Sequence, residues 1–233
     1  MMRVGLLEKI KAAGFVRVVI RPTVIPESLT VVTAREVVKN ASVSLRGWDY
    51  PHIAARNDKH GGYEHHAEYA QDWCDWYHHV EFWRMYKSGQ FLHYKALREG
   101  LSKEGNVPKG PVLAVGSFMY TVTEVTEFAH RLRAAGLYKE GATIHVVLGN
   151  SRGRRLWVED PMRLDFLSPM VTSAESITVE RSIRTSDLLL GDPKDISLSM
   201  IAEFFDAFGW TPSQDLISST QTELYNLKLG RDG

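Results

Sequence analysis

The chain has 233 residues, 44% of them hydrophobic and 24% charged, and its 28 Lys and Arg residues balance 28 Asp and Glu residues. This composition is that of an ordinary globular protein, and it excludes a global electrostatic field that would recruit nucleic acid or an anionic membrane. A single cysteine, Cys74, excludes an internal disulfide framework and a multi-cysteine zinc site. No apolar run approaches the roughly 20 residues that span a bilayer. The sequence therefore predicts a cytoplasmic protein without membrane contact, with residues 1–233 in one compact domain.

Residue patterns in the first part of the chain predict helices and strands in alternation. Gly14 follows the opening helix at the position where glycine commonly ends helices, and Thr33 with Glu36 has the spacing of a capping box. β-branched residues before Pro22 and alternating apolar residues in "ASVSL" indicate two strands. This order favours an α/β arrangement with a parallel crossover. The expected elements are a helix over 6–13, a strand over 15–22, a helix over 34–39 and a strand over 41–45.

The middle of the chain is rich in aromatic residues and histidines. Residues 64–87 fit one long helix or a strand followed by a helix, and we favour a helix over 76–87 that ends at the Ser-Gly pair behind it. On that helix Trp83 widens a buried face, so "EFWRMYKSGQF" is predicted to be a structural joint between a helix and an extended segment. Residues 101–111 combine Gly, Asn, Pro and Lys without periodicity, which is typical of a linker or hinge.

The last part of the chain has clearer helical and strand patterns. Apolar residues recur at helical spacing up to Leu132, and Gly136 is expected to end that helix. Asp192 caps a later helix, with Pro193 in its first turn. The whole pattern predicts an α/β or α+β fold, a mixed sheet flanked by helices with the C-terminal helices packed across it. The expected elements here are a helix over 118–132, strands over 142–149 and 175–183, and helices over Asp192–Phe208 and Pro212–Leu229.

Histidines cluster in the middle segment. On a helix, His65 with Glu68 and His78 with Glu81 would each lie three residues apart on one face. Glu-x-x-His pairs ligate paired metals in helix bundles, but there the glutamate comes first and other helices add carboxylates. We therefore expect polar surface positions, no bound metal and no cofactor. The alternative is a metal-assisted hydrolase or nuclease that uses this Asp- and His-rich segment. The clustered histidines are His60, His65, His66, His78 and His79.

The stretch "SLRGWDYPH" (44–52) concentrates polar and aromatic side chains behind a predicted strand. Arg46 can hold a phosphate or carboxylate through two parallel hydrogen bonds, with Trp48 as one wall of the site. Asp49 can accept a hydrogen bond from an amine or orient His52 as a general base. The structural alternative is a rigid corner in which Arg46 pairs with Asp49 and Trp48 fills the edge of the core.

A basic loop, "NSRGRRLW" (150–157), follows another predicted strand. The carboxyl ends of parallel neighbouring strands lie side by side, so we expect this loop and Arg46 to hold one anionic group. A basic groove beside an aromatic ring also suits single-stranded nucleic acid. The alternative is a solvated loop whose arginines pair with the acidic residues that follow. The loop arginines are Arg152, Arg154 and Arg155.

The motifs of several enzyme classes do not occur in the sequence. There is no phosphate-binding Gly-Lys-Ser/Thr loop, no dinucleotide-binding glycine fingerprint and no nucleophile elbow. This favours a non-enzymatic binding or sensing module over an enzyme. The expected partner is an anionic small molecule, a nucleic acid or another protein.

Three stretches, "SLRGWDYPH", "EFWRMYKSGQFLH" and "YTVTEVTEFAHRL", resemble a bacterial region that lies beside Schlafen-type AlbA-like modules, which bind ATP or nucleic acid. The resemblance covers residues 17–156, and the region has no assigned chemistry. The chain has no segment that matches the AlbA-like module itself, so no ATP- or DNA-binding residue carries over. The resemblance implies a stand-alone companion or sensing domain in a defence or regulatory setting.

Overall fold

The structure is a computed structural model that describes residues 2–26, 29–101, 107–184 and 192–229. For residues 227–229 it describes the backbone alone. Within these ranges the strands are β1 (Phe15–Pro22), β2 (Gly61–His65), β3 (Tyr69–Asp75), β4 (Val80–Tyr86), β5 (Phe91–Ala96), β6 (Val112–Ala114), β7 (Ala142–Gly149), β8 (Arg155–Trp157) and β9 (Ser176–Ile183). The helices are α1 (Leu6–Ala12), α2 (Val31–Ala41), α3 (Arg98–Leu101), α4 (Val115–Ala134), α6 (Pro193–Asp206) and α7 (Gln214–Leu229). None of these helices is both long enough and apolar enough to cross a membrane.

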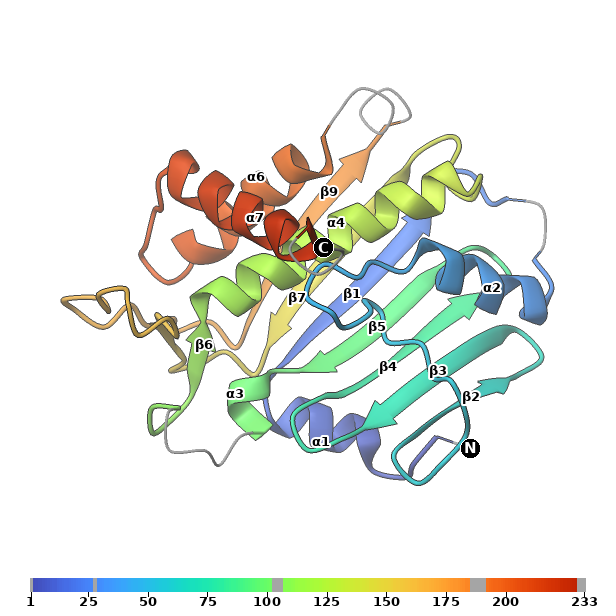
Figure 1. Cartoon of the computed structure of the whole chain (residues 1–233), viewed down its shortest axis with the longest axis horizontal. Helices are drawn as coiled ribbons and strands as arrows, with labels where there is room; N and C mark the ends of the chain where they lie inside the picture. Colours follow the sequence, from blue (N-terminus) through green and yellow to red (C-terminus); the bar gives the residue numbers. More distant parts are fainter. Residues whose placement is uncertain (1, 27–28, 102–106, 185–191, 230–233) are drawn as a thin grey trace.

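The described strands form one antiparallel sheet of seven strands and a separate parallel pair. The sheet runs in the order β2-β3-β4-β5-β1-β7-β9, and β6 pairs with β8. Helices α2, α4 and α6 cover one face of the sheet, α7 packs on α4 and α6, and α1 lies against the opposite face (Figure 1). The predicted fold, a sheet flanked by helices with the C-terminal helices packed across it, is confirmed. The predicted parallel crossover is wrong, because β1 is antiparallel to both of its neighbours, β5 and β7.

Helix ends follow local capping chemistry, with one correction. Gly14 follows α1 with a φ of 79°, a left-handed conformation that favours glycine. Asp192 caps α6 with its side chain, as predicted. At α2, however, the cap is Thr30, whose hydroxyl accepts a hydrogen bond from the backbone N–H of Thr33. The helix therefore begins earlier than predicted, and the capping box of Thr33 and Glu36 is wrong.

The predicted helix over 76–87 is also wrong, because this segment is a turn followed by strand β4. Phe82 packs beneath α1, whereas Trp83 and Met85 pack into the core on the other face of the sheet. Since both faces of β4 are covered here, apolar residues occupy consecutive positions, and the alternation typical of a half-buried strand is lost. Trp83 is buried as predicted, but as a strand residue.

The predicted strand in "ASVSL" is not formed either. Residues 42–60 instead run in front of β5, β4 and β3 before the chain enters β2 (Figure 1). Their extended part makes one isolated bridge, between Val43 and Tyr50. The indole N–H of Trp83 donates a 2.8 Å hydrogen bond to the carbonyl of His52 and so fastens the segment to the sheet. This segment contains most of the residues predicted to form a site.

The predicted hinge at 101–111 lies partly outside the described residues, which resume at 107. The large sheet is built from strands on both sides of it. β1 pairs with β5, which precedes the predicted hinge, and with β7, which follows it. The two parts of the chain therefore share one sheet and one continuous core cluster.

Candidate functional site

A cavity of about 500 Å³ opens between the sheet and the first half of α4. Its walls come mainly from residues 46–50, the turn between β3 and β4, the end of β5 with α3, and one face of α4. Arg46, Trp48 and Asp49 from the predicted site lie on these walls. The lining residues are Val16, Arg46, Trp48, Asp49, Tyr50, Trp76, Tyr77, His78, His79, Lys95, Ala96, Leu97, Arg98, Glu99, Leu113, Ser117, Phe118, Thr121 and Glu124.

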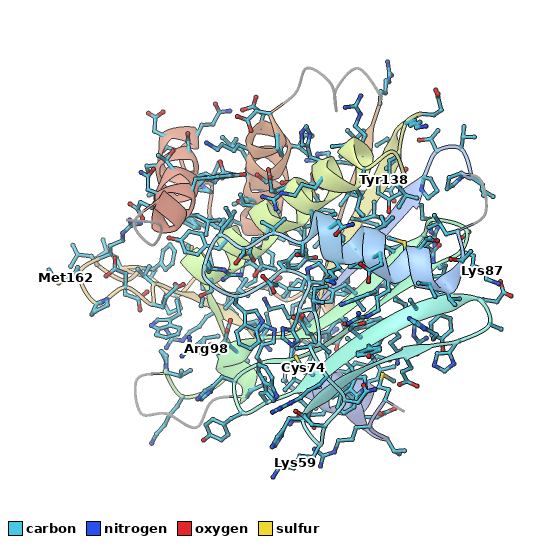
Figure 2. All side chains as sticks on the ribbon, turned by 45° about the vertical axis from the view of Figure 1, so that its right-hand side comes forward. Lys59, Cys74, Lys87, Arg98, Tyr138 and Met162 are labelled. Carbon is cyan, nitrogen blue, oxygen red and sulfur yellow. The ribbon has the colours of Figure 1, made fainter. Side chains whose placement is uncertain are left out.

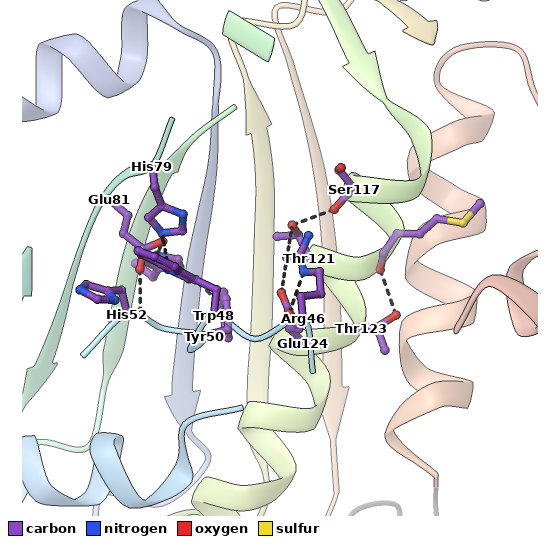
Figure 3. A network of polar contacts seen from close by, with 12 residues as sticks. Arg46, Trp48, Tyr50, His52, His79, Glu81, Ser117, Thr121, Thr123 and Glu124 are labelled. Atoms are coloured by element: carbon purple, nitrogen blue, oxygen red, sulfur yellow. Dashed lines mark hydrogen bonds and ion pairs between the residues drawn. The ribbon is translucent and has the colours of Figure 1, made fainter. Parts of the chain in front are cut away.

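Arg46 is held against α4 by a two-point ion pair. Its Nε donates to Glu124 Oε1 at 2.9 Å and its Nη2 donates to Glu124 Oε2 (Figure 3). The Glu124 side chain is only 1% exposed, so loss of Arg46 would leave a buried carboxylate without this partner. The structural alternative predicted that Arg46 pairs with Asp49. Arg46 pairs with Glu124 instead. Much of its charge is already neutralised before any ligand binds.

Trp48 forms an aromatic wall between the cavity and a buried polar cluster around Glu81. Its ring stacks on His52 with a centroid distance of 4.9 Å and meets the edge of Trp76 at 4.8 Å. Its indole N–H donates to His79 Nε2 at 3.0 Å (Figure 3). His52 itself does not line the cavity, and burial lowers the pKa of its ring. The ring of His52 thus supports Trp48.

Lys95 brings an amino group to the cavity from strand β5. Burial lowers the pKa of Lys95, and the nearby Arg46 lowers it further, while Glu81 and Glu124 act in the opposite direction. Within the described part of the chain, no hydrogen bond or ion pair engages the Lys95 ammonium. Its neighbours have other partners: Glu124 is bound by Arg46, and a carboxylate oxygen of Glu99 accepts the backbone N–H of Ala114 at 2.9 Å.

A buried polar cluster lies behind the Trp48 wall, around Glu81 of strand β4. Glu81 Oε2 is 2.8 Å from His79 Nε2 and 3.4 Å from His93 Nε2. Burial alone would raise the pKa of Glu81, but the two imidazole rings outweigh it and hold that pKa well below its usual range. Burial raises the pKa of the Cys74 thiol well above its usual range, and the charge of Glu81 adds to this. The cluster therefore combines a carboxylate, two imidazoles and a protonated thiol.

No family model, curated protein or solved structure matches this chain. The chemistry of the site therefore has to be inferred from its own side chains.

The basic loop at 150–157 does not reach the cavity wall. Arg152 is exposed and pairs with Glu175 at 3.0 Å. Arg154 is buried and donates to backbone carbonyls, among them that of Val112 at 2.5 Å, so it holds β6 and the loop together. Arg155 is a residue of β8. The expected pairing with the acidic residues directly after the loop is not found for Arg152, and the loop does not present three free arginines to a ligand.

The sequence analysis missed the residues that come from β4 and β5. Lys95 stands in "FLHYKAL" and Glu81 in "VEFW", each a charged residue in a mostly apolar and aromatic stretch. A charge at such a position is seldom buried without a partner, which makes it a candidate for a functional role. For Glu81 the signal was hidden by the helical interpretation of 76–87, which placed this residue on a solvated face.

Proposed function

We propose that this protein is a binding module that recognises a small molecule with a planar ring and an anionic group. The supporting observation is the Lys95 ammonium, which lies on the cavity wall without an ion pair to any described residue. A partly buried charge is costly unless a partner of opposite charge approaches it. The anionic group of a ligand would be that partner. Arg98, exposed at the same cavity, adds a second positive charge.

The aromatic residues of the cavity favour a planar ring in the ligand. Trp48, Trp76 and Tyr77 all line it, and aromatic faces bind flat rings by offset stacking or edge-to-face contacts. Asp49 on the same wall can accept a hydrogen bond from a ring N–H or amine. A volume of about 500 Å³ suits a ligand of ordinary metabolite size. A nucleotide or an aromatic carboxylate fits this description.

The charge distribution favours a small molecule over a nucleic acid. The formal net charge is zero, and Arg152 already has a carboxylate partner. Nucleic acid binding draws most of its affinity from several cations that contact successive phosphates. The described cations of the cavity suffice for one or two anionic groups. A sensing role agrees with the resemblance to a region found beside Schlafen-type modules.

Matched pairs of charged and neutral compounds test this proposal. Calorimetric titration with adenosine monophosphate against adenosine, and with indole-3-carboxylate against its carboxamide, is expected to favour the anion of at least one pair by about tenfold or more. Lys95→Met should remove that preference, because the variant keeps the side-chain stem and loses the charge. Lys109→Met, which alters an exposed lysine outside the cavity, is the control and should behave as the unmodified protein.

Three results would contradict the proposal. One is equal affinity for the charged and neutral members of every pair, and another is the absence of binding by any of them. A third is salt-sensitive binding of a single-stranded oligonucleotide that Lys95→Met leaves unchanged, since this would place the relevant cations elsewhere on the surface.

A further inference from the structure

The β3–β4 hairpin brings three metal-binding side chains together, and one of them, His79, also lines the cavity (Cys74 is labelled in Figure 2). The donor atoms of Cys74, His79 and Glu81 all lie within 4.8 Å of one another. Cys74 and Glu81 are directly opposed in the antiparallel register, so their side chains point to the same face of the sheet. His79 ends the turn that precedes β4. This proximity follows from the strand pairing and could not arise on the helix predicted from the sequence.

A further donor, His93 on strand β5, lies beside Glu81 but outside the set of atoms that are all within 4.8 Å of one another, so it would have to move toward a bound ion. Its side chain is 1% exposed, and among the described residues its Nε2 has no hydrogen-bond partner, although it lies 3.4 Å from Glu81 Oε2. The other ring nitrogen, Nδ1, is 3.2 Å from the hydroxyl of Tyr50. Metal-bound histidines commonly show this arrangement, in which the second nitrogen donates to an outer partner and fixes the ring.

Protons alone do not satisfy the hydrogen-bonding demands at His79. Its Nε2 lies 3.0 Å from the indole nitrogen of Trp48, which can only donate, and 2.8 Å from Glu81 Oε2, which as a carboxylate can only accept. One imidazole nitrogen carries either a proton or a lone pair, so it cannot satisfy both neighbours. A cation between the nitrogen and the carboxylate takes the place of the shared proton, and the Trp48 N–H is then available to a molecule in the cavity.

We infer that Cys74, His79 and Glu81 bind one divalent transition metal ion of the zinc class, with His93 as the fourth donor. Sulfur, imidazole nitrogen and carboxylate oxygen together suit Zn²⁺ in tetrahedral coordination. Binding requires the Cys74 thiol to lose its proton, so metal uptake releases a proton to the solvent. This inference does not depend on the proposed ligand of the cavity. It replaces the expectation of no metal, whose premise was a helix through this segment.

Cobalt spectroscopy tests the metal site directly, because the chain has a single cysteine. Metal-free, full-length protein is titrated with Co²⁺, and the near-ultraviolet absorption is recorded. A thiolate-to-cobalt band that saturates at one equivalent and disappears when Zn²⁺ is added is the expected result. Cys74→Ser should abolish the band, and His93→Gln should weaken Co²⁺ binding by at least tenfold. His66→Ala, at an exposed histidine of the same region, should leave both unchanged.

The spectrum of the unmodified protein decides the question even if a variant fails to fold. Cobalt binding without a thiolate band, or no binding at all, would overturn the site. So would a titration that His66→Ala reduces as strongly as His93→Gln, since that would identify exposed histidines as the ligands. Lys95→Met leaves every proposed donor in place and should keep the cobalt band. Loss of ligand preference and loss of metal are therefore separate results.

Discussion

Replacing Trp83 by alanine is expected to lower the free energy of unfolding by about 3–5 kcal/mol. The side chain is fully buried, at 0% exposure, in the core between the sheet and the helices above it. Its removal leaves a cavity in a strand that is covered on both faces. The variant also loses the 2.8 Å hydrogen bond from the indole N–H to the carbonyl of His52. Packing and hydrogen bonding therefore act in the same direction, and chemical denaturation measures their sum.

Two further variants identify the cause of that loss. Trp83→Phe keeps most of the ring volume but lacks the donor, so it should lose less stability than Trp83→Ala. Tyr77→Ala removes an aromatic ring that is 65% exposed and should change the free energy of unfolding by about 0.5 kcal/mol or less. If Trp83→Ala behaved like Tyr77→Ala, the interior position of Trp83 would be wrong.

The helices and strands that the sequence predicted well have one feature in common: each has a single buried face or a clear local signal at its end. Helix α4 shows apolar residues at helical spacing and is followed by Gly136, with a φ of 90°. Helix α6 has Asp192 as its cap and a proline in its first turn. Strands β1, β7 and β9 are rich in β-branched residues. In these cases local chemistry and tertiary packing favour the same structure.

The hairpin of β3 and β4 could not be predicted from the same rules. Its strands are covered by α1 on one face and by α2 with residues 42–60 on the other, so neither strand alternates cleanly between apolar and polar residues. Phe82, Met85 and Tyr86 then occur at i, i+3 and i+4, a spacing that also fits one face of a helix. The helices that cover the two faces, α1 and α2, are far from the hairpin in the sequence, and local patterns do not contain them.

Part of the cavity lining comes from a stretch that the sequence analysis singled out. "SLRGWDYPH" does supply one wall of the cavity, through Arg46, Trp48 and Asp49. Other parts of the lining come from Lys95 on β5 and Glu124 on α4, which approach this stretch only through the antiparallel pairing and the packing of α4 on the sheet. The expectation that the loop at 150–157 joins this site rested on parallel strands. The antiparallel register removes that premise.

Replacing Arg35 by alanine is expected to cost about 3–5 kcal/mol of stability, because it leaves a buried carboxylate without its partner. Arg35 on α2 donates to both oxygens of Asp72 on β3, from Nε at 2.9 Å and from Nη2 at 2.8 Å. The same Nη2 donates to the carbonyl of Ala54 at 2.8 Å, and the Ala54 N–H donates to Asp72 at 2.9 Å. One ion pair thus joins a helix, a strand and the segment that carries Trp48.

The control lies on the same helix. Lys39 is 52% exposed and pairs with Glu36 across the surface, so Lys39→Ala should cost only about 0–1 kcal/mol. A double variant, Arg35→Ala with Asp72→Asn, should lose less than the sum of the two single losses, because the uncompensated charge is gone. Additive losses, or an Arg35→Ala loss as small as that of Lys39→Ala, would contradict a buried, coupled pair.

Because Ala54 is anchored by both partners, Arg35→Ala should also loosen the chain that positions Trp48, and ligand binding in the cavity should weaken with it.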